Sequence, residues 1–118
     1  MKFSQIEIKA KQYQEAETHP IFISWVKGLL EENKKEELED CFYKDLDFGT
    51  GGLRGIIGPG SNRMNPLNVQ KATQGLVDYL KQTCEDTSPL SIVIAYDSRR
   101  YSATFAEETA LVCAANGV

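Results

Sequence analysis

An octapeptide near the middle of the chain combines backbone freedom with a strong cation. It reads Phe-Gly-Thr-Gly-Gly-Leu-Arg-Gly over residues 48–55, so half of its positions are glycine and one is Arg54. Glycine backbone turns sharply and brings bare N–H groups close to an anion, and the guanidinium of arginine presents a fixed fork of donors that suits phosphate oxygens. The stretch therefore predicts a phosphoryl-binding site with these candidate contacts: Thr50, Gly51, Gly52 and Arg54. The alternative is a glycine-rich turn with a solvent-exposed arginine.

The known nucleotide-binding patterns do not fit this loop. No lysine follows a glycine at the place that a P-loop requires, and Arg54 stands where the third glycine of a Gly-x-Gly-x-x-Gly pattern belongs. A second cation, Arg63, follows the Gly-Pro-Gly of residues 58–60. We expect Arg63 to bond to loop carbonyls and to have a structural role.

Two charged residues, Asp97 and Arg99, follow an apolar, β-branched run at residues 91–96. Such a run is typical of a strand that is covered on both faces. Ligands of open α/β sheets gather beyond the carboxyl ends of the strands, so Asp97 and Arg99 are candidates for active-site support. The alternative is a salt-bridged pair that only holds the loop.

The elements that must position these residues begin with a helical arm over residues 1–44. Residues 3–17 are rich in helix formers and predict a polar, loosely packed helix. Pro20 suits the first turn of a second helix, and His19 before it is expected to be a surface or capping residue. One apolar stripe at helical spacing follows, made of Ile21, Trp25, Val26, Leu29 and Leu30.

From residue 45 the predicted order is strand, helix, strand, helix. Residues 53–58 are a short candidate strand, and Asn65 is placed to cap a helix over residues 66–84. A polar connection at residues 85–89 leads to the predicted strand at 91–96.

The last predicted helix begins where Ser102 can cap it and ends at Asn116-Gly117. It is apolar over so much of its circumference that we expect it to be buried.

This order predicts an α/β chain: a truncated three-layer α/β/α domain with a mainly parallel or mixed sheet over residues 45–118, preceded by the arm. Two strands are few for a sheet of this kind. A further strand is predicted after the last helix, and Val118 would be its first residue. We therefore expect the chain to be a piece of a longer protein.

Composition excludes several classes of function. The net charge of −4 over 118 residues argues against nucleic acid as a partner, since such binders carry a basic face. No apolar run approaches the length of a membrane span, so no membrane partner is expected. Three cysteines without a Cys-x-x-Cys predict reduced thiols in a cytoplasmic protein, and no metal ligands are expected within the chain.

The octapeptide, the run Gly-Pro-Gly-Ser-Asn-Arg-Met-Asn at residues 58–65 and Ala-Tyr-Asp-Ser-Arg at residues 95–99 resemble the first domain of the α-D-phosphohexomutases, the phosphoglucomutase/phosphomannomutase family. The match covers residues 45–118 in family order. The arm resembles the longer phosphoglucomutase- and phosphopentomutase-like members.

The resemblance implies a reversible phosphoryl transfer between positions 1 and 6 of a hexose phosphate, or 1 and 5 of a pentose phosphate. In the family a phosphoserine and a sugar bisphosphate intermediate carry the group, and Mg²⁺ bound by three aspartates offsets the charge. Sugar mono- and bisphosphates are the implied partners. The arginine of the Gly-Leu-Arg-Gly motif lies at the active site, which assigns the catalytic role to Arg54.

The chain departs from the family in lacking the Thr-Ala-Ser-His-Asn-Pro phosphoserine motif and the aspartate-rich metal loop. These 118 residues alone are therefore expected to be inactive. Two alternatives stay open: a non-catalytic phosphate-binding module, and an interaction module whose exposed sheet edge leads to self-association.

Overall fold

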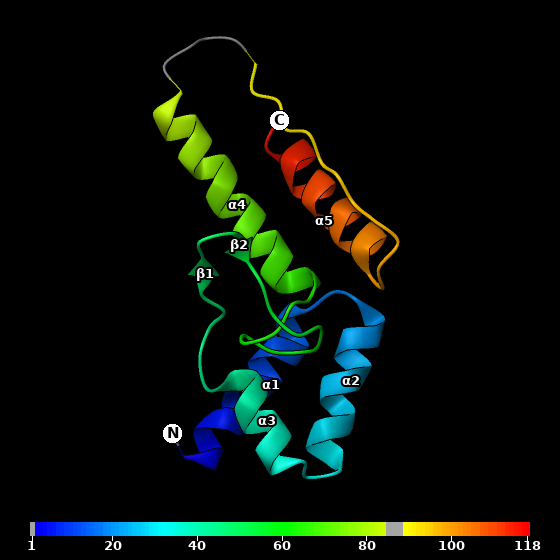
Figure 1. Ribbon diagram of the computed structural model, residues 1–118. Coiled ribbons are helices and arrows are strands. Elements are labelled where there is room, and N and C mark those ends of the chain that lie inside the picture. Colours follow the sequence, from blue (N-terminus) through cyan, green and yellow to red (C-terminus); the bar gives the residue numbers. More distant parts are fainter. Residues whose placement is uncertain (1, 85–88) are drawn as a thin grey trace. The chain divides into compact units, whose positions relative to one another are not determined.

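The computed structural model of the chain describes residues 2–84 and 89–118 and is drawn as a ribbon in Figure 1. It divides into two compact units, Met1–Asn68 and Val69–Val118. The expected domain boundary at residue 45 stays a prediction. Most of the polar connection expected at residues 85–89 lies outside the described residues.

Three helices build the core of the first unit: α1 (Phe3–Ala16), α2 (Pro20–Glu31) and α3 (Lys35–Phe42). They pack around a cluster of buried side chains that comprises Ile6, Ala10, Tyr13, Val26, Leu29, Leu38, Cys41 and Phe42. The expectation of a loosely packed first helix was wrong, because three buried residues of α1 belong to this cluster. Their spacing of four and three residues puts them on one face of the helix, although polar residues dominate its composition.

The start of α2 confirms the roles expected of His19 and Pro20. His19 is the N-cap residue, its Nδ1 accepts a hydrogen bond from the Ile21 backbone N–H (3.3 Å), and proline opens the first turn. The buried face of α2 differs in part from the predicted apolar stripe, however. Phe22 is fully buried, whereas Ile21 and Trp25 are exposed, and the Trp25 ring stacks on Phe22.

After α3 the chain forms a small antiparallel hairpin from β1 (Phe48–Gly49) and β2 (Gly52–Leu53), in which Phe48 is opposite Leu53 and Gly49 is opposite Gly52. A single parallel bridge joins Ile57 to Met64 further on. The strand predicted at residues 53–58 is therefore only partly formed. Gly55 within this run and Gly58 at its end interrupt regular pairing, since glycine weakens a strand.

The second unit contains most of α4 (Pro66–Thr83) and all of α5 (Ser102–Ala115), which run alongside each other in Figure 1. Polar bonds join the two helices: Gln70 Nε2 donates to Glu108 (2.7 Å), and Gln74 and Asn116 exchange amide hydrogen bonds of 3.2 and 2.8 Å. The side chain of Val77 is fully buried.

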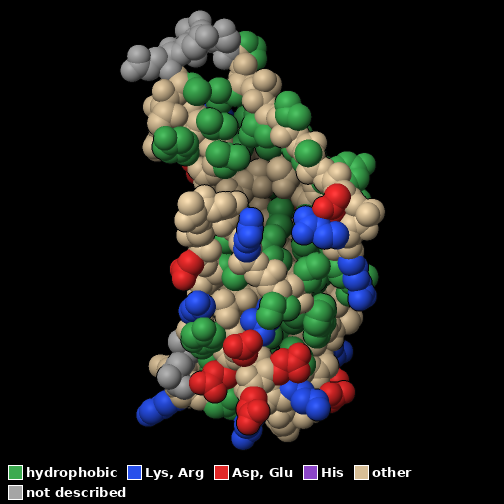
Figure 2. Space-filling model, in the orientation of Figure 1, with side chains coloured by type: hydrophobic (Ala, Val, Ile, Leu, Met, Phe, Trp, Pro, Cys, Tyr) green, Lys and Arg blue, Asp and Glu red, His purple; other side chains and the backbone are tan. Residues whose placement is uncertain are grey.

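The burial expected of α5 was wrong. Cys113 is its buried residue, and Leu111 is 57% exposed. Figure 2 shows hydrophobic side chains gathered on the surface over α4 and α5. Ser102 does not cap the helix either. It is the first helical residue, preceded by Tyr101 in the left-handed conformation at φ 66°. The predicted end at Asn116-Gly117 is confirmed, with Gly117 at φ 76°.

Residues 91–96 do not form the predicted strand. Within the described residues no strand pairs with them, and Val93 is 96% exposed. A strand that is apolar on both faces needs neighbours on each side, and these neighbours are lacking here. The described residues thus form an α/β structure of helices with a two-stranded antiparallel sheet. None of the described helices is long and apolar enough to cross a membrane.

Candidate functional site

The glycine-rich octapeptide folds into the hairpin of β1 and β2, with Thr50 and Gly51 at its turn. Gly52 has a φ of +109°, a conformation that glycine adopts without strain and other residues avoid. Thr50 and Gly51 are exposed, and Gly52 is half-buried. The structure therefore brings the predicted contact residues together on one short turn.

Arg54 directly follows β2 and folds back over the turn. An ideal Cβ built on Gly51 would lie 3.2 Å from the Arg54 Nη2 atom, so the guanidinium covers the glycine backbone. Arg54 is exposed and makes no hydrogen bond or ion pair with any described residue. Its donors are free to bind an anion above the turn.

The hairpin is held at its base by hydrogen bonds to the loop of residues 58–65. On one side of the base, the Leu46 backbone N–H donates to Ser61 O (2.9 Å). On the other side, the Met64 N–H donates to Ile56 O (2.7 Å). Within the loop itself, the Gly58 N–H donates to Met64 O (3.0 Å). The position of the hairpin thus depends on this loop.

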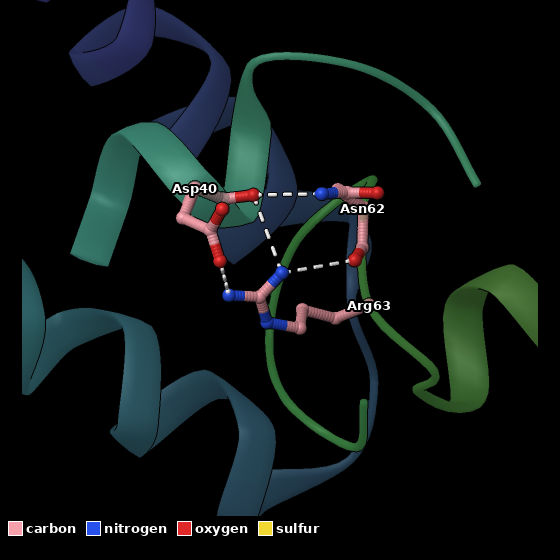
Figure 3. Close-up of polar contacts among 3 residues, drawn as sticks. All are labelled: Asp40, Asn62 and Arg63. Carbon is pink, nitrogen blue, oxygen red and sulfur yellow. Dashed lines mark hydrogen bonds and ion pairs between the residues drawn. The ribbon is translucent and has the colours of Figure 1, made fainter. Parts of the chain in front are cut away.

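The loop is fixed to the end of α3 by Arg63, as Figure 3 shows. Arg63 is buried, and its Nη2 forms an ion pair with Asp40. Its Nη1 donates to the backbone oxygens of Asp40 (3.2 Å) and Asn62 (3.1 Å). The expectation that Arg63 bonds to backbone carbonyls and has a structural role is confirmed.

Asn65 joins the same loop to the start of α4. Its side chain is fully buried, and its Nδ2 donates to the carbonyl oxygens of Gly58 (2.9 Å) and Gly60 (2.8 Å). Its Oδ1 accepts a hydrogen bond from the Asn68 N–H (3.0 Å). The predicted helix cap is therefore confirmed, and the amide nitrogen adds contacts that the sequence pattern did not predict.

A buried carboxylate, Glu17, also supports this region and was missed from the sequence. It accepts hydrogen bonds from the Tyr13 hydroxyl (2.7 Å), from the Thr18 backbone (2.8 Å) and from the Leu67 backbone in the first turn of α4 (3.3 Å). Asp40 was missed as well, because both acids stand among many charged residues. Only pairing across more than twenty residues distinguishes Asp40 from its neighbours.

Two buried acids of the first unit are unsuited to proton transfer near neutral pH. Burial raises the pKa of the Cys41 thiol to about 11. Burial, together with the hydrogen bond to Glu17, also raises the pKa of Tyr13 well above its ordinary value. Both groups stay protonated and serve packing.

Asp97 and Arg99 lie in the second unit and pair with each other. The Arg99 backbone N–H donates to Asp97 Oδ1 (3.0 Å), and Arg99 Nε donates to Asp97 Oδ2 (2.7 Å). The backbone hydrogen bond and the guanidinium lower the pKa of Asp97. The structure thus supports the alternative of a salt-bridged pair that holds the loop. Their part in an active site stays a prediction.

The described residues contain no group of three or more His, Cys, Asp or Glu side chains that could hold a metal ion. Mg²⁺ prefers several oxygen ligands around one point, carboxylates among them. The magnesium implied by the family resemblance does not fit these residues, and its ligands would have to come from elsewhere.

The family model described as phosphoglucomutase/phosphomannomutase, alpha/beta/alpha domain I, matches residues 45–118 of the chain. The matched range contains the hairpin, the loop of residues 58–65 and the Asp97–Arg99 pair.

Three curated relatives show the same similarity. Human phosphopentomutase is 36% identical over 98 residues, which cover 83% of this chain and 16% of that protein. The probable phosphoribomutase of Schizosaccharomyces pombe is 41% identical over 87 residues, or 74% of this chain and 15% of the relative. The phosphoglucomutase of Staphylococcus saprophyticus is 39% identical over 95 residues, or 80% and 17%. The match thus spans less than a fifth of each relative. No solved structure matches the chain significantly.

Proposed function

The chain belongs to the phosphoglucomutase/phosphomannomutase family, and we propose that it supplies part of domain I of a sugar-phosphate mutase. The reaction is a reversible transfer of a phosphoryl group between positions 1 and 6 of a hexose phosphate, or 1 and 5 of a pentose phosphate. A phosphoserine and a bisphosphate intermediate carry the group. The names of the relatives, phosphopentomutase, phosphoribomutase and phosphoglucomutase, support both sugar classes.

The observation that carries this proposal is the guanidinium of Arg54, which lies above the glycine turn and pairs with no described residue. Phosphoryl transfer is catalysed by positioning and by stabilising charge on the transferring oxygens. In the proposed role, Arg54 donates to those oxygens, and the backbone N–H groups of Thr50, Gly51 and Gly52 are close enough in sequence to add further donors.

One arginine cannot carry the reaction by itself. The uncatalysed reaction of phosphate esters is so slow that enzymes supply on the order of 20 kcal/mol. A single well-placed donor accounts for roughly 3–4 kcal/mol of this. We therefore propose that these 118 residues alone are inactive, and that a cytoplasmic mutase supplies the serine and the metal ligands from other parts of its chain.

The same proposal accounts for the run at residues 91–96, with which no strand of the described part of the chain pairs. In a three-layer α/β/α domain it is a strand whose partners come from outside this chain, and α5 then covers the sheet. Exposed apolar side chains such as Val93 and Tyr96 support this, since a finished domain would bury them.

A graft tests the proposal. Residues 45–118 replace the matching stretch of the phosphoglucomutase from Staphylococcus saprophyticus, and conversion of glucose 1-phosphate to glucose 6-phosphate is measured. We expect a folded graft with clear turnover, because the segment supplies the required arginine and loop. A graft that melts cooperatively but turns over no faster than the enzyme with its own stretch deleted would contradict the proposal.

An interaction module is a second candidate, and residues 91–96, which pair with no strand among the described residues, favour it. Backbone that is extended, apolar and unpaired is a template for strand addition by another chain. Sedimentation of the 118-residue chain tests this candidate: a dimer that dissociates when Val93 is replaced by lysine supports it, and a monomer at high concentration excludes it. A phosphate-binding module would instead bind inorganic phosphate at the hairpin more tightly than millimolar.

A further inference from the structure

The glycine-rich hairpin has few contacts that could fix its direction. Its turn is exposed, and Arg54 bonds to no described residue. At its base, Gly55 is packed so closely against Leu46 that an added Cβ would lie 2.7 Å from the leucine Cδ2. Two backbone bonds, Leu46 N–H to Ser61 O and Met64 N–H to Ile56 O, connect this base to the loop of residues 58–65. Whatever fixes that loop therefore fixes the hairpin.

Asp40 at the end of α3 makes the contacts that hold the loop to the helices of the first unit. Its carboxylate pairs with Arg63, and its backbone oxygen accepts hydrogen bonds from Arg63 Nη1 (3.2 Å) and Asn62 Nδ2 (2.9 Å). Figure 3 shows these contacts converging on one residue. The next residue contributes as well, since the Asn62 N–H donates to Cys41 O (2.9 Å).

The two partners of the ion pair differ in their exposure. The Arg63 side chain is 10% exposed, whereas that of Asp40 is 59% exposed. A buried guanidinium that loses its carboxylate is left with an uncompensated charge, so it moves toward water. Because the Asp40 carboxylate is exposed, it can be substituted without disturbing the buried side chains, and such a substitution tests the ion pair by itself.

We propose that Asp40, through Arg63 and the loop of residues 58–65, is a positioning residue that aims the glycine-rich hairpin at its phosphoryl ligand. This inference rests on the proposed function, because it assigns the ligand to Arg54. It gives the helical arm a task in phosphate binding although the arm holds no ligand-binding residue itself.

The direction in which one substitution changes the phosphate affinity separates this positioning role from a general electrostatic effect. Removing any carboxylate near an anion site raises the local potential and tightens phosphate binding. Loss of the positioning contact weakens binding instead. The Asp40→Asn variant is therefore expected to bind inorganic phosphate about fivefold more weakly, the loss typical of one ion-pair contact.

Asp47→Asn is the matched control. Asp47 pairs loosely with Lys44 at 3.9 Å, is 84% exposed and directly precedes the hairpin. It carries the same charge closer in sequence to the proposed ligand, yet among the described residues it pairs with Lys44 and not with Arg63 or the loop. We expect its phosphate affinity to equal or exceed that of the unsubstituted chain. Asp40→Glu, which keeps the carboxylate, is expected to restore most of the affinity.

Amide NMR on the 118-residue chain provides the readouts. Chemical-shift changes of residues 49–54 during phosphate titration give the affinity for phosphate. Hydrogen exchange without ligand shows how well the hydrogen bonds at the base of the hairpin protect their amides. In Asp40→Asn, we expect faster exchange at the two amides that bond the hairpin base to the loop, Leu46 and Met64. Exchange at Ala10 in α1 should stay unchanged, which separates a local effect from global destabilisation.

Each outcome decides one question. Equal affinities and equal exchange in Asp40→Asn and Asp47→Asn would overturn the positioning role. Faster exchange at Leu46 and Met64 without any phosphate response in the unsubstituted chain would keep the mechanical link but refute Arg54 as a phosphate ligand. Uniformly faster exchange throughout α1 would show a merely structural role and would also overturn the inference.

Discussion

Replacing Gly60 by alanine is expected to destabilise the first unit strongly. Gly60 has a φ of +118°, and a Cβ added there would lie 2.4 Å from the Cys41 carbonyl oxygen and 3.0 Å from its carbonyl carbon. Strained backbone of this kind costs about 1–3 kcal/mol, and forcing a methyl group into packed surroundings costs about 1–3 kcal/mol more. We therefore expect the free energy of unfolding to fall by roughly 4 kcal/mol.

The matched control is Gly28→Ala in α2. Nothing lies within 4 Å of a Cβ at Gly28, and the residue is in the interior of a helix. Alanine loses less conformational entropy than glycine when a helix forms, so this variant is expected to gain about 0.5–1 kcal/mol. The same substitution is thus expected to lower the free energy of unfolding at one position of the unit and to raise it at the other.

Urea titration followed by the fluorescence of Trp25 measures both effects. Trp25 is the single tryptophan of the chain and stacks on the buried Phe22, so its emission reports on the first unit. A decrease of roughly 4 kcal/mol is a large part of the free energy of unfolding of small domains, which is typically about 5–15 kcal/mol. A Gly60→Ala variant within about 1 kcal/mol of the unsubstituted chain would refute the described packing of the loop against Cys41.

Three further predictions concern groups near the same loop or elsewhere in the chain. Asn65→Asp keeps the capping oxygen but loses the donors to Gly58 and Gly60, so the free energy of unfolding should fall by about 2–4 kcal/mol in urea titration; an unchanged midpoint would contradict these bonds. Ellman's reagent should label Cys84, which is exposed, in the native chain, and should reach buried Cys41 and Cys113 only after denaturation; rapid labelling of all three would disprove that burial. Burial raises the pKa of Cys41 from 9.0 to about 11, so the unfolded chain loses this proton first as the pH rises. The thiol's contribution to stability is full below about pH 9 and is lost by about pH 11, and Cys41→Ala should flatten this part of the stability curve; an identical slope in both chains would count against it.

Local signals along the sequence predicted much of the first unit and of α4. His19-Pro20 and Asn65-Pro66 marked the starts of α2 and α4, because capping and proline geometry act within a few residues. The hairpin residues were identified by glycine content, since a tight turn of this kind needs them. The ion pair of Arg63 with Asp40 could not be predicted, because it joins residues that are distant along the chain.

The second unit shows where sequence reasoning fails for a physical reason. The run at residues 91–96 has the composition of a central strand, but a strand forms only when partners are present. Likewise, α5 has the composition of a buried helix, yet Leu111 is 57% exposed within this chain. In both cases the residues indicate an environment that the described part of the chain does not supply.

The effect of Arg54→Ala on kcat/KM in the graft of residues 45–118 tests the central claim most directly. Loss of a donor to the transferring phosphoryl group should lower kcat/KM by roughly a hundredfold. Lys71→Ala, which removes an exposed cation from α4, is the control and should change it less than about twofold. Near-normal kcat/KM in the Arg54→Ala graft would contradict the assignment of this arginine to the phosphoryl group.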